Sequence, residues 1–388
     1  MDPQSLAQSL TPSKVHAAHA LIKPYIHRTP LLTNKTLNGI ASTPQTPDAL
    51  KGTPYEGQTP AAPTIRFFFK CENLQRIGAF KARGAFHALL RLIEERGEEE
   101  VRRMGVVTHS SGNHAQALAL ASSTLNIPSY IVMPSISTTS KIEGTKAYAT
   151  KVVFSGSTST EREAVVAEVQ SQTDAILIPP YDDFNIICGQ GTTGLEIEEQ
   201  YLELLAQNPQ LSVHGSSGSG LDAVITPIGG GGLNAGVATF FSDKKTRVFG
   251  AEPSFEGADD CRRGLEAGER VTSVKSLTIG DGLRTPVGLL NWEVISDKKK
   301  VEGVFAVTEE QIKAAMRLVL ERMKVVVEPS AVVGLAVCLF NEEFRRIVER
   351  EGGEEGWDIG IVFSGGNTTV EAIGKLFSRK DICPWIGE

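Results

Sequence analysis

The sequence predicts an α/β fold with two lobes, each built on a mostly parallel sheet that is flanked by helices. Short apolar runs alternate with amphipathic stretches along most of the 388 residues, which is the pattern of parallel strands joined by helices. Several of these runs end in turns rich in glycine or serine, as expected at the ligand-binding rim of such sheets. We expect residues 105–182 to form a smaller lobe, inserted into a larger lobe made by residues 1–104 and 183–388.

The composition indicates a soluble globular protein. Hydrophobic residues make up 41% of the chain, enough for a large core, and the formal net charge of −7 argues against nucleic acid or an anionic membrane as partner. Five widely spaced cysteines without a CxxC pair indicate reduced thiols and a cytoplasmic protein. The chain start lacks a signal-peptide pattern, and the most apolar window contains Glu328 and Pro329, so no membrane span is expected.

Helices and strands alternate through the first half of the chain. Residues 6–26 predict one or two short helices, with Thr11 and Pro12 as cap and first turn. Residues 41–64 are rich in Pro, Thr and Ala, so we expect an exposed insertion with the composition of disordered segments. Beyond it, the patterns predict strands at 67–69, 105–108, 129–133, 152–154 and 175–178, and helices at 82–96, 114–125, 141–149 and 161–172.

The second half continues this alternation. An acidic helix is expected at residues 190–206, followed by a flexible insertion at residues 207–220. The remaining patterns predict strands at 221–226, 246–251, 303–307 and 359–363, and long helices at 309–324 and 331–348. Internal repeats are absent from the sequence.

Lys81 follows an apolar strand, a polar loop and the aromatic residue Phe80. A lysine reacts as an amine only when it is deprotonated, and burial beside apolar groups lowers its pKa. Such lysines form Schiff bases with carbonyl compounds. A lysine that opens a helix is ordinarily solvated, so this residue alone leaves both interpretations open.

A run of four glycines lies between an apolar strand and a predicted helix. In VITPIGGGGL the run comprises Gly229, Gly230, Gly231 and Gly232. Successive glycines let backbone N–H groups converge on an anion, and the following helix adds its positive end. A flexible linker is the alternative, but linkers seldom join a buried strand to a helix. The P-loop lysine and a ribose-binding carboxylate are missing, so a small phosphorylated cofactor is favoured over a nucleotide.

Two further turns follow predicted strands. HSSGNH, residues 109–114, is either a simple helix cap or a carboxylate cradle of hydroxyls, an amide and helix N–H groups. SGGN, residues 364–367, is either a plain strand-to-helix turn or part of the same ligand-binding rim.

Together these stretches resemble the fold-type II pyridoxal-phosphate enzymes, with the tryptophan synthase β-like fold, and specifically the serine/threonine dehydratases and serine racemases. The resemblance covers roughly residues 20–380. It is carried by FKCENLQRIGAFKARGA, VVTHSSGNHAQALA, PPYDDFNIICGQGT, PIGGGGLNAG, AEPSFEGADD, DGLRTPVG, ERMKVVVEPSAVVGLA and IVFSGGN. It implies a large lobe that binds pyridoxal 5'-phosphate, a small mobile lobe that binds substrate, and a homodimer.

The resemblance also assigns residues. Lys81 resembles the Schiff-base lysine, Phe80 the residue against the pyridine ring, and Ser364 the partner of the pyridine nitrogen. Asn113 resembles the residue bonded to the phenolic oxygen, and the glycine run with Leu233 the phosphate-binding loop. The expected cofactor contacts are Phe80, Lys81, Asn113, Gly229, Gly230, Gly231, Gly232, Leu233, Glu328 and Ser364. The expected substrate contacts are Ser110, Ser111, Gly112, Asn113 and His114.

A divalent-cation site is implied at Glu252, Asp260 and a backbone carbonyl near Ala258, where oxygen ligands suit Mg²⁺ or Ca²⁺. The stretch EPSFEGADD is about two residues longer than in the racemases, by comparison with their spacing. A surface cluster of carboxylates remains the alternative.

The implied chemistry is dehydration of L-serine or L-threonine to a 2-oxo acid and ammonia, with Lys81 as general base. A serine opposite the pyridine nitrogen is a neutral partner, which favours loss of a β-hydroxyl. Ser111 resembles the second-face acid of the racemases, so serine racemase capacity is expected beside elimination. Alternatives are serine racemisation as the main activity, dehydration of 3-hydroxyaspartate, or a specialised biosynthetic racemase or lyase.

Other features narrow these alternatives. Arg162 or Arg284 would favour 3-hydroxyaspartate if either faced the β-carbon pocket. Ile77 stands where a hydroxyl would be expected for nucleotide binding, so activation by ATP is not expected. The short segment after IVFSGGN leaves no room for an isoleucine-sensing regulatory domain. A catalytically silent cofactor-binding or regulatory protein is the hypothesis from another class, and intact Lys81, Ser111 and Ser364 argue against it.

Overall fold

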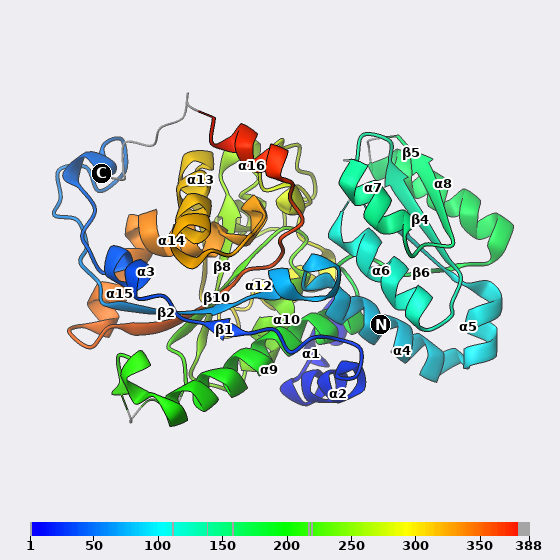
Figure 1. Ribbon diagram of the computed structural model, residues 1–388, viewed down its shortest axis with the longest axis horizontal. Helices are drawn as coiled ribbons and strands as arrows, with labels where there is room; N and C mark the ends of the chain where they lie inside the picture. The colour runs from blue at the N-terminus through cyan, green and yellow to red at the C-terminus, as the bar shows by residue number, and fades with distance from the viewer. Residues whose placement is uncertain are drawn as a thin grey trace.

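The computed structural model describes residues 2–110, 112–137, 139–156, 159–215, 218 and 220–378, and within them the chain forms two sheets (Figure 1). The larger sheet has the order β1-β2-β10-β7-β8-β9, with every neighbouring pair parallel except β1 and β2. Its strands are β1 (Leu31–Leu32), β2 (Ile65–Lys70), β7 (Ala223–Pro227), β8 (Arg247–Pro253), β9 (Gly303–Val307) and β10 (Trp357–Val362). The predicted α/β fold is therefore confirmed.

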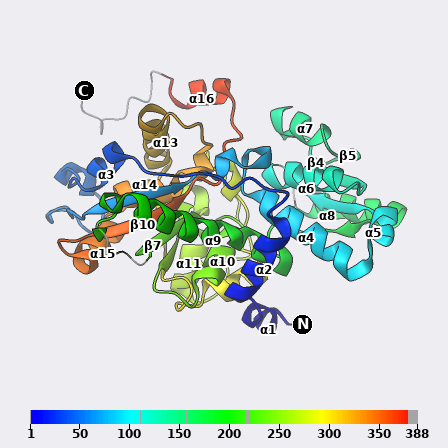
Figure 2. The ribbon, with the colours of Figure 1, turned by 60° about the horizontal axis from the view of Figure 1, so that its bottom comes forward.

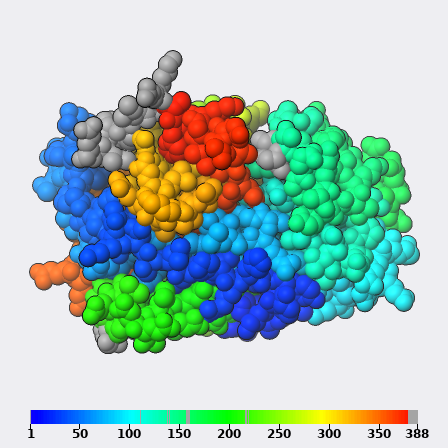
Figure 3. All heavy atoms as spheres, viewed as in Figure 1, coloured from blue at the N-terminus to red at the C-terminus, as the bar shows by residue number. Residues whose placement is uncertain are grey.

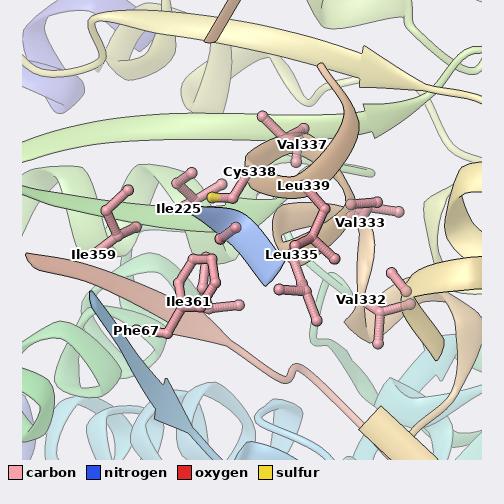
Figure 4. Packing of buried hydrophobic residues seen from close by; sticks show 14 of the residues in the cluster. Phe67, Ile225, Val332, Val333, Leu335, Val337, Cys338, Leu339, Ile359 and Ile361 are labelled. Atoms are coloured by element: carbon pink, nitrogen blue, oxygen red, sulfur yellow. The ribbon is translucent and has the colours of Figure 1, made fainter. Parts of the chain in front are cut away.

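Helices bury both faces of the larger sheet (Figures 1 and 2). Successive side chains of a strand point to opposite faces, so Phe67 and Phe69 pack on one face and Phe68 on the other. The Phe67 face is covered by α3 (Lys35–Ala41), α13 (Glu309–Leu318), α14 (Val333–Phe340) and α15 (Glu342–Gly352). The opposite face is covered by α2 (Pro12–Ile22), α9 (Phe184–Gln207), α10 (Gly232–Phe241) and α12 (Leu289–Ile295). Figure 4 shows α14 side chains meeting Ile225, Ile359 and Ile361 on the first face.

The smaller sheet has the order β5-β4-β3-β6 and is parallel throughout. Its strands are β3 (Val106–His109), β4 (Ser129–Pro134), β5 (Lys151–Ser155) and β6 (Ile176–Leu177). Its surrounding helices are α4 (Lys81–Arg96), α5 (Glu98–Met104), α6 (Asn113–Thr124), α7 (Thr139–Lys146) and α8 (Ser159–Thr173). This sheet and its helices form one end of the molecule (Figure 3). The division of the chain at residues 104/105 and 182/183 stays a prediction.

Several predicted helices have different bounds in the structure, and two of the differences have a clear local cause. The helix expected at residues 331–348 is two helices, α14 and α15, because Asn341 is extended and its side chain accepts a hydrogen bond from the Phe344 N–H. The helix expected at residues 190–206 begins earlier, at Phe184, where the Asp183 side chain accepts from two backbone N–H groups. The remaining α-helices of the described residues are α1 (Pro3–Gln8), α11 (Asp260–Ala267) and α16 (Val370–Leu376).

The first half of α9 was not predicted from the sequence because it contains several glycines. Gly191 packs against α10 so closely that a Cβ atom there would lie 2.6 Å from the Gly236 carbonyl oxygen. Glycine lowers helix propensity, but here it lets the two helices approach each other. Within the described residues, none of the helices combines the length and apolar character needed to cross a bilayer.

Parts of the insertion at residues 41–64 are buried or hydrogen-bonded to the rest of the chain. The predicted exposure and disorder are wrong for those parts. Arg345, which is buried on α15, donates to the carbonyl oxygens of Ala41, Thr43 and Ala61 at 2.7, 2.8 and 3.1 Å. Leu50, within the insertion, is also buried. The second insertion is attached too, because the Val213 N–H in its described part donates to Asp358 at 3.0 Å.

Arg345→Ala should destabilise the fold by about 2–4 kcal/mol, because buried carbonyl groups lose their donor. Urea unfolding measures the stability, and limited proteolysis should show faster cleavage within residues 41–64. Arg350→Ala, on the exposed side of the same helix, is the control and should behave like the wild type. Wild-type stability and wild-type protease resistance in Arg345→Ala would contradict this account.

Candidate active site

A cavity of about 370 Å³ lies among the turns at the carboxyl ends of β2, β3, β6, β7 and β10. Most of the residues expected to bind cofactor or substrate line it. They are Phe80, Lys81, Ser110, Gly112, Asn113, His114, Gly229, Gly230, Gly231, Gly232, Leu233, Glu328 and Ser364. Ser111 lies outside the described residues. The structure thus brings together side chains and turns far apart in sequence, while their roles stay predictions.

Lys81 is the first residue of α4 and its amine reaches the cavity. Its Nζ atom donates to the Pro180 carbonyl oxygen at 2.7 Å. The Nζ atom also lies 5.2 Å from the ring centre of Phe80 and 5.9 Å from that of Tyr181. Burial lowers the pKa of Lys81 from 10.5 to about 8. A larger fraction of this amine is therefore neutral near pH 7–8 than for a solvated lysine.

A buried group of four charges includes Arg83, which lies two residues after Lys81 on α4. Arg83 Nη2 lies 2.7 Å from a carboxylate oxygen of Glu72 and 2.7 Å from one of Glu196. Lys70 Nζ lies 2.6 Å from Glu196 Oε2. All four side chains are at most 1% exposed. We call these residues the charge cluster, and it joins β2 and its following turn to α4 and α9.

The four glycines form the turn between β7 and α10. Gly231 has a φ of +92°, a conformation that L side chains rarely adopt. A Cβ atom at Gly230 would overlap the Tyr181 ring, and one at Gly232 would lie 3.0 Å from the Tyr181 carbonyl oxygen. The turn therefore has no side chains of its own over its backbone N–H groups, and it lies at a helix N-terminus, which favours an anion.

Asn113 and Glu328 meet across the cavity wall. Asn113 Nδ2 donates to Glu328 Oε1 at 2.8 Å, and Asn113 Oδ1 accepts from Asn367 Nδ2 at 2.9 Å. Glu328 is buried, and its Oε2 atom has no hydrogen-bond partner in the described chain. Burial, and then the negative charge of Asp281, raise the pKa of Glu328 to about 7. This carboxyl group is thus protonated more readily near neutral pH than that of a solvated glutamate.

Ser364 and the loop after β3 complete the wall. Ser364 is buried, and its carbonyl oxygen accepts from the Phe80 N–H at 3.1 Å, which ties the end of β10 to the start of α4. In the loop, Ser110 Oγ accepts from the Gly112 N–H at 3.3 Å. Burial, and then the positive charge of Lys81, lower the pKa of His114 to about 3, so this imidazole is neutral at physiological pH.

The candidate cation residues lie apart from the cavity. Glu252, at the end of β8, accepts from the Cys261 and Arg262 N–H groups at 3.0 and 2.9 Å. Asp260 Oδ2 accepts from the Val287 N–H at 3.1 Å, while Asp260 Oδ1 is buried without a partner among the residues that the structure describes. Burial raises the pKa of Glu252, as does the nearby charge of Asp260.

Such a carboxylate pair suits a divalent cation with oxygen ligands. No group of three or more His, Cys, Asp or Glu side chains placed to hold a metal occurs within the described residues. The pair would therefore depend on backbone oxygens, such as a carbonyl near Ala258, which is buried. The site remains a prediction.

Several polar residues that line the cavity were not predicted from the sequence, among them Tyr181, Lys141 and Asp281. Tyr181 follows Pro179 and Pro180 in the loop after β6, and an aromatic residue near a strand end was the available signal. Of the two arginines considered for a β-carboxylate, Arg162 lines the cavity. Arg284 instead donates to the Thr278 carbonyl oxygen at 2.6 Å and is not part of the cavity wall.

Gly230→Ala should weaken binding of pyridoxal 5'-phosphate more than about tenfold, because its Cβ atom would displace Tyr181 from the turn. Titration of the cofactor-free protein, followed by absorbance, gives the dissociation constant. Gly374→Ala in α16 is the control, because a Cβ atom there meets nothing within 4 Å. Unchanged affinity in a folded Gly230→Ala protein would contradict the assignment of this turn.

Comparison with known proteins identifies the family. The chain is 40% identical to serine racemase of Arabidopsis thaliana over 94% of this chain and 95% of that protein. The structure of maize serine racemase matches with a TM-score of 0.77 and 36% identity, covering 94% of this chain and 96% of that one. The structure of a threonine deaminase from T.th. matches with a TM-score of 0.71 and 35% identity, covering 92% of this chain and 99% of that one. Residues 51–365 match the family model described as pyridoxal-phosphate dependent enzyme, and the chain belongs to this family.

Proposed function

We propose that this enzyme is a dehydratase, or ammonia-lyase, that converts L-serine or L-threonine to a 2-oxo acid and ammonia and also racemises serine. The observation that carries the proposal is the buried amine of Lys81, with its pKa near 8, in a cavity shared with the glycine turn and Ser364. The names of the similar proteins, serine racemase and threonine deaminase, support it.

The residues of the cavity fit pyridoxal 5'-phosphate. The glycine turn offers backbone N–H groups where no Cβ atom could be accommodated, which suits the phosphate group. Lys81 offers an amine of lowered pKa to the aldehyde, and Ser364 and Asn113 offer polar groups to the ring. When bound, the cofactor delocalises the negative charge that develops at the substrate Cα atom.

The residues of the chain supply orientation and proton transfer. The substrate amine would displace Lys81 from the cofactor, and the freed, neutral Lys81 Nζ takes the Cα proton as general base. The loop of Ser110, Gly112 and His114, at the start of α6, binds the substrate carboxylate through hydroxyl and backbone N–H groups. Ser364 would be a neutral partner for the ring nitrogen, and such a partner favours loss of the β-hydroxyl. Ser111 donates a proton to the opposite face of Cα, which gives the D-amino acid.

The direct test is incubation of the cofactor-loaded protein with L-serine, D-serine and L-threonine, with 2-oxo acid and chiral amino acids measured in the same tube. We expect 2-oxo acid from L-serine and L-threonine, together with D-serine from L-serine. Ser111→Ala should abolish racemisation while sparing elimination of one enantiomer. Equal loss of both activities would contradict the opposite-face assignment, and neither product from the wild type would contradict the proposed function.

The rate of elimination should rise with pH and level off above about pH 8. Burial lowers the pKa of Lys81 to about 8, so below that pH the amine is mostly protonated and cannot accept the Cα proton. The expected slope at low pH is about tenfold in kcat per pH unit. Steady-state assays between pH 6 and 9.5 measure kcat. As a control, the coupling enzymes of the assay must stay in excess at every pH. A flat profile across this range would contradict the role of Lys81.

We also propose that Glu252, Asp260 and a carbonyl near Ala258 bind Mg²⁺ or Ca²⁺. Adding either cation to the chelator-treated protein should raise its melting temperature, because the cation binds the folded state. Asp260→Asn should remove this shift, whereas Asp243→Asn, at an exposed position, should retain it. An equal shift in both variants would show that the cation binds elsewhere.

The resemblance further supports a homodimer in the cytoplasm and a mobile lobe at residues 105–182. Light scattering of the purified protein tests the dimer, and a monomer mass at assay concentration would contradict it.

Comparison of hydrogen exchange with and without substrate tests the mobile lobe. Closure of the lobe predicts protection that is concentrated in residues 105–182.

A further inference from the structure

Asn291, on α12, contacts the glycine turn without lining the cavity. Its side chain is fully buried. Its Nδ2 atom donates to the Gly230 carbonyl oxygen at 2.6 Å and to the Tyr181 carbonyl oxygen at 3.2 Å. The Gly288 N–H, just before α12, donates to the same Gly230 oxygen at 3.0 Å. One buried side chain therefore joins two segments that form the cavity wall.

These hydrogen bonds determine which way the peptide between Gly230 and Gly231 faces. The described residues contain no cis peptide bond, and in a trans peptide the C=O and N–H groups point in opposite directions. The Gly230 C=O group points at Asn291 and the start of α12. The Gly231 N–H group therefore points away from α12, toward the cavity that both glycines line. No backbone oxygen of the described residues accepts from this N–H group, which leaves it for an anion.

The second acceptor of Asn291 connects the glycine turn to the segment that faces Lys81. Lys81 Nζ donates to the Pro180 carbonyl oxygen at 2.7 Å, and the next carbonyl group along the chain is that of Tyr181. Asp182 then accepts from two backbone N–H groups in the first turn of α12, at 2.8 and 2.9 Å. Residues 180–182 and α12 are thus bonded to each other, and Asn291 extends this arrangement to the glycine turn.

An asparagine suits this position because an amide nitrogen carries two N–H groups and can donate to two carbonyl oxygens at once. A buried carbonyl oxygen that loses its donor is costly. Without Asn291, the Gly230 peptide would lower that cost by rotating its oxygen toward the cavity. Gly231 permits such a rotation, because no side chain restrains its backbone. The rotation would turn the Gly231 N–H away from the cavity and point an oxygen at the anion instead.

We infer that Asn291 is a positioning residue for the phosphate group of the cofactor, because it holds the peptide between Gly230 and Gly231 with its N–H toward the cavity. Asn291 does not line the cavity, so it acts through the turn. The inference rests on the proposed assignment of the glycine turn to the phosphate group. Loss of Asn291 should therefore weaken ligands that carry a phosphate and spare those without one.

The test compares two ligands that differ by the phosphate group. Pyridoxal 5'-phosphate and pyridoxal both carry the aldehyde that is expected to react with Lys81. Titration of the cofactor-free protein, followed by absorbance, gives a dissociation constant for each, and their ratio measures the preference for phosphate. Asn291→Ala should lower this preference about tenfold, because one hydrogen bond to a charged group is lost. The affinity for pyridoxal should stay close to that of the wild type.

Asn234→Ala is the matched control. Asn234 is also fully buried and is also the third residue of its helix, α10. Its Nδ2 atom donates twice as well, to Thr226 Oγ1 at 2.9 Å and to the Phe249 carbonyl oxygen at 3.0 Å. Neither acceptor belongs to the glycine turn. Both variants should lose stability, seen as a lower melting temperature, whereas only Asn291→Ala should lose the preference for phosphate.

A second measurement uses inorganic phosphate and needs no aldehyde. Phosphate should raise the melting temperature of the cofactor-free wild type and of Asn234→Ala, because it binds the folded state. Asn291→Ala should need about tenfold more phosphate for the same shift. Asn291→Leu keeps most of the side-chain volume but lacks the amide, and it should behave like Asn291→Ala. This agreement would exclude an effect of the space that alanine leaves.

Three outcomes would overturn the inference. Equal losses of affinity for both compounds in Asn291→Ala would show that the residue only supports the fold. An unchanged preference in either Asn291 variant would show that the peptide keeps its orientation without the amide. The same loss of preference in Asn234→Ala would trace the effect to stability. By contrast, a wild-type protein that binds pyridoxal as tightly as pyridoxal 5'-phosphate would refute the assignment of the glycine turn itself, which the wild-type titration reveals before any variant is compared.

Discussion

The buried charge cluster of Lys70, Glu72, Arg83 and Glu196 is the interaction on which the site depends. Removing one partner from such a cluster leaves an uncompensated charge in the interior, at a cost of about 3–5 kcal/mol. The four residues come from β2 and its following turn, α4 and α9, so their pairing fixes the start of α4 relative to the larger sheet. Lys81 lies two residues before Arg83. The position of the Lys81 amine therefore depends on four charged residues that do not line the cavity.

The same cluster reaches the glycine turn through helix packing. Glu196 lies on α9, and Gly191 of the same helix packs against Gly236 of α10. Because α10 begins at the glycine turn, this packing fixes the position of the turn relative to Lys81. Burial then shifts the pKa values of the ionisable groups in the cavity. It lowers the pKa values of Lys81 and His114 and raises that of Glu328, so all three are shifted toward their neutral forms.

What could be predicted from sequence was local. Lys81 after Phe80 and the glycine run after a buried strand carry their signal within a few residues, and the structure places them in one cavity. The break at Asn341 was missed because a single capping side chain decides it. The ion pair between Lys141 and Asp281 was missed because its members lie 140 residues apart on different elements. The attachment of residues 41–64 depends on Arg345 of α15. The composition of the insertion gives no sign of this contact.

The central claim is that Lys81 holds the cofactor in the cavity described above. The most direct measurement is borohydride reduction of the cofactor-loaded protein, followed by peptide mapping with mass spectrometry. Reduction converts the lysine–cofactor bond to a stable pyridoxyl amine, which marks the residue permanently. The account predicts the label on the peptide that contains Lys81. A label on Lys70 or Lys141 instead, or none on a protein that binds the cofactor and turns over L-serine, would contradict it.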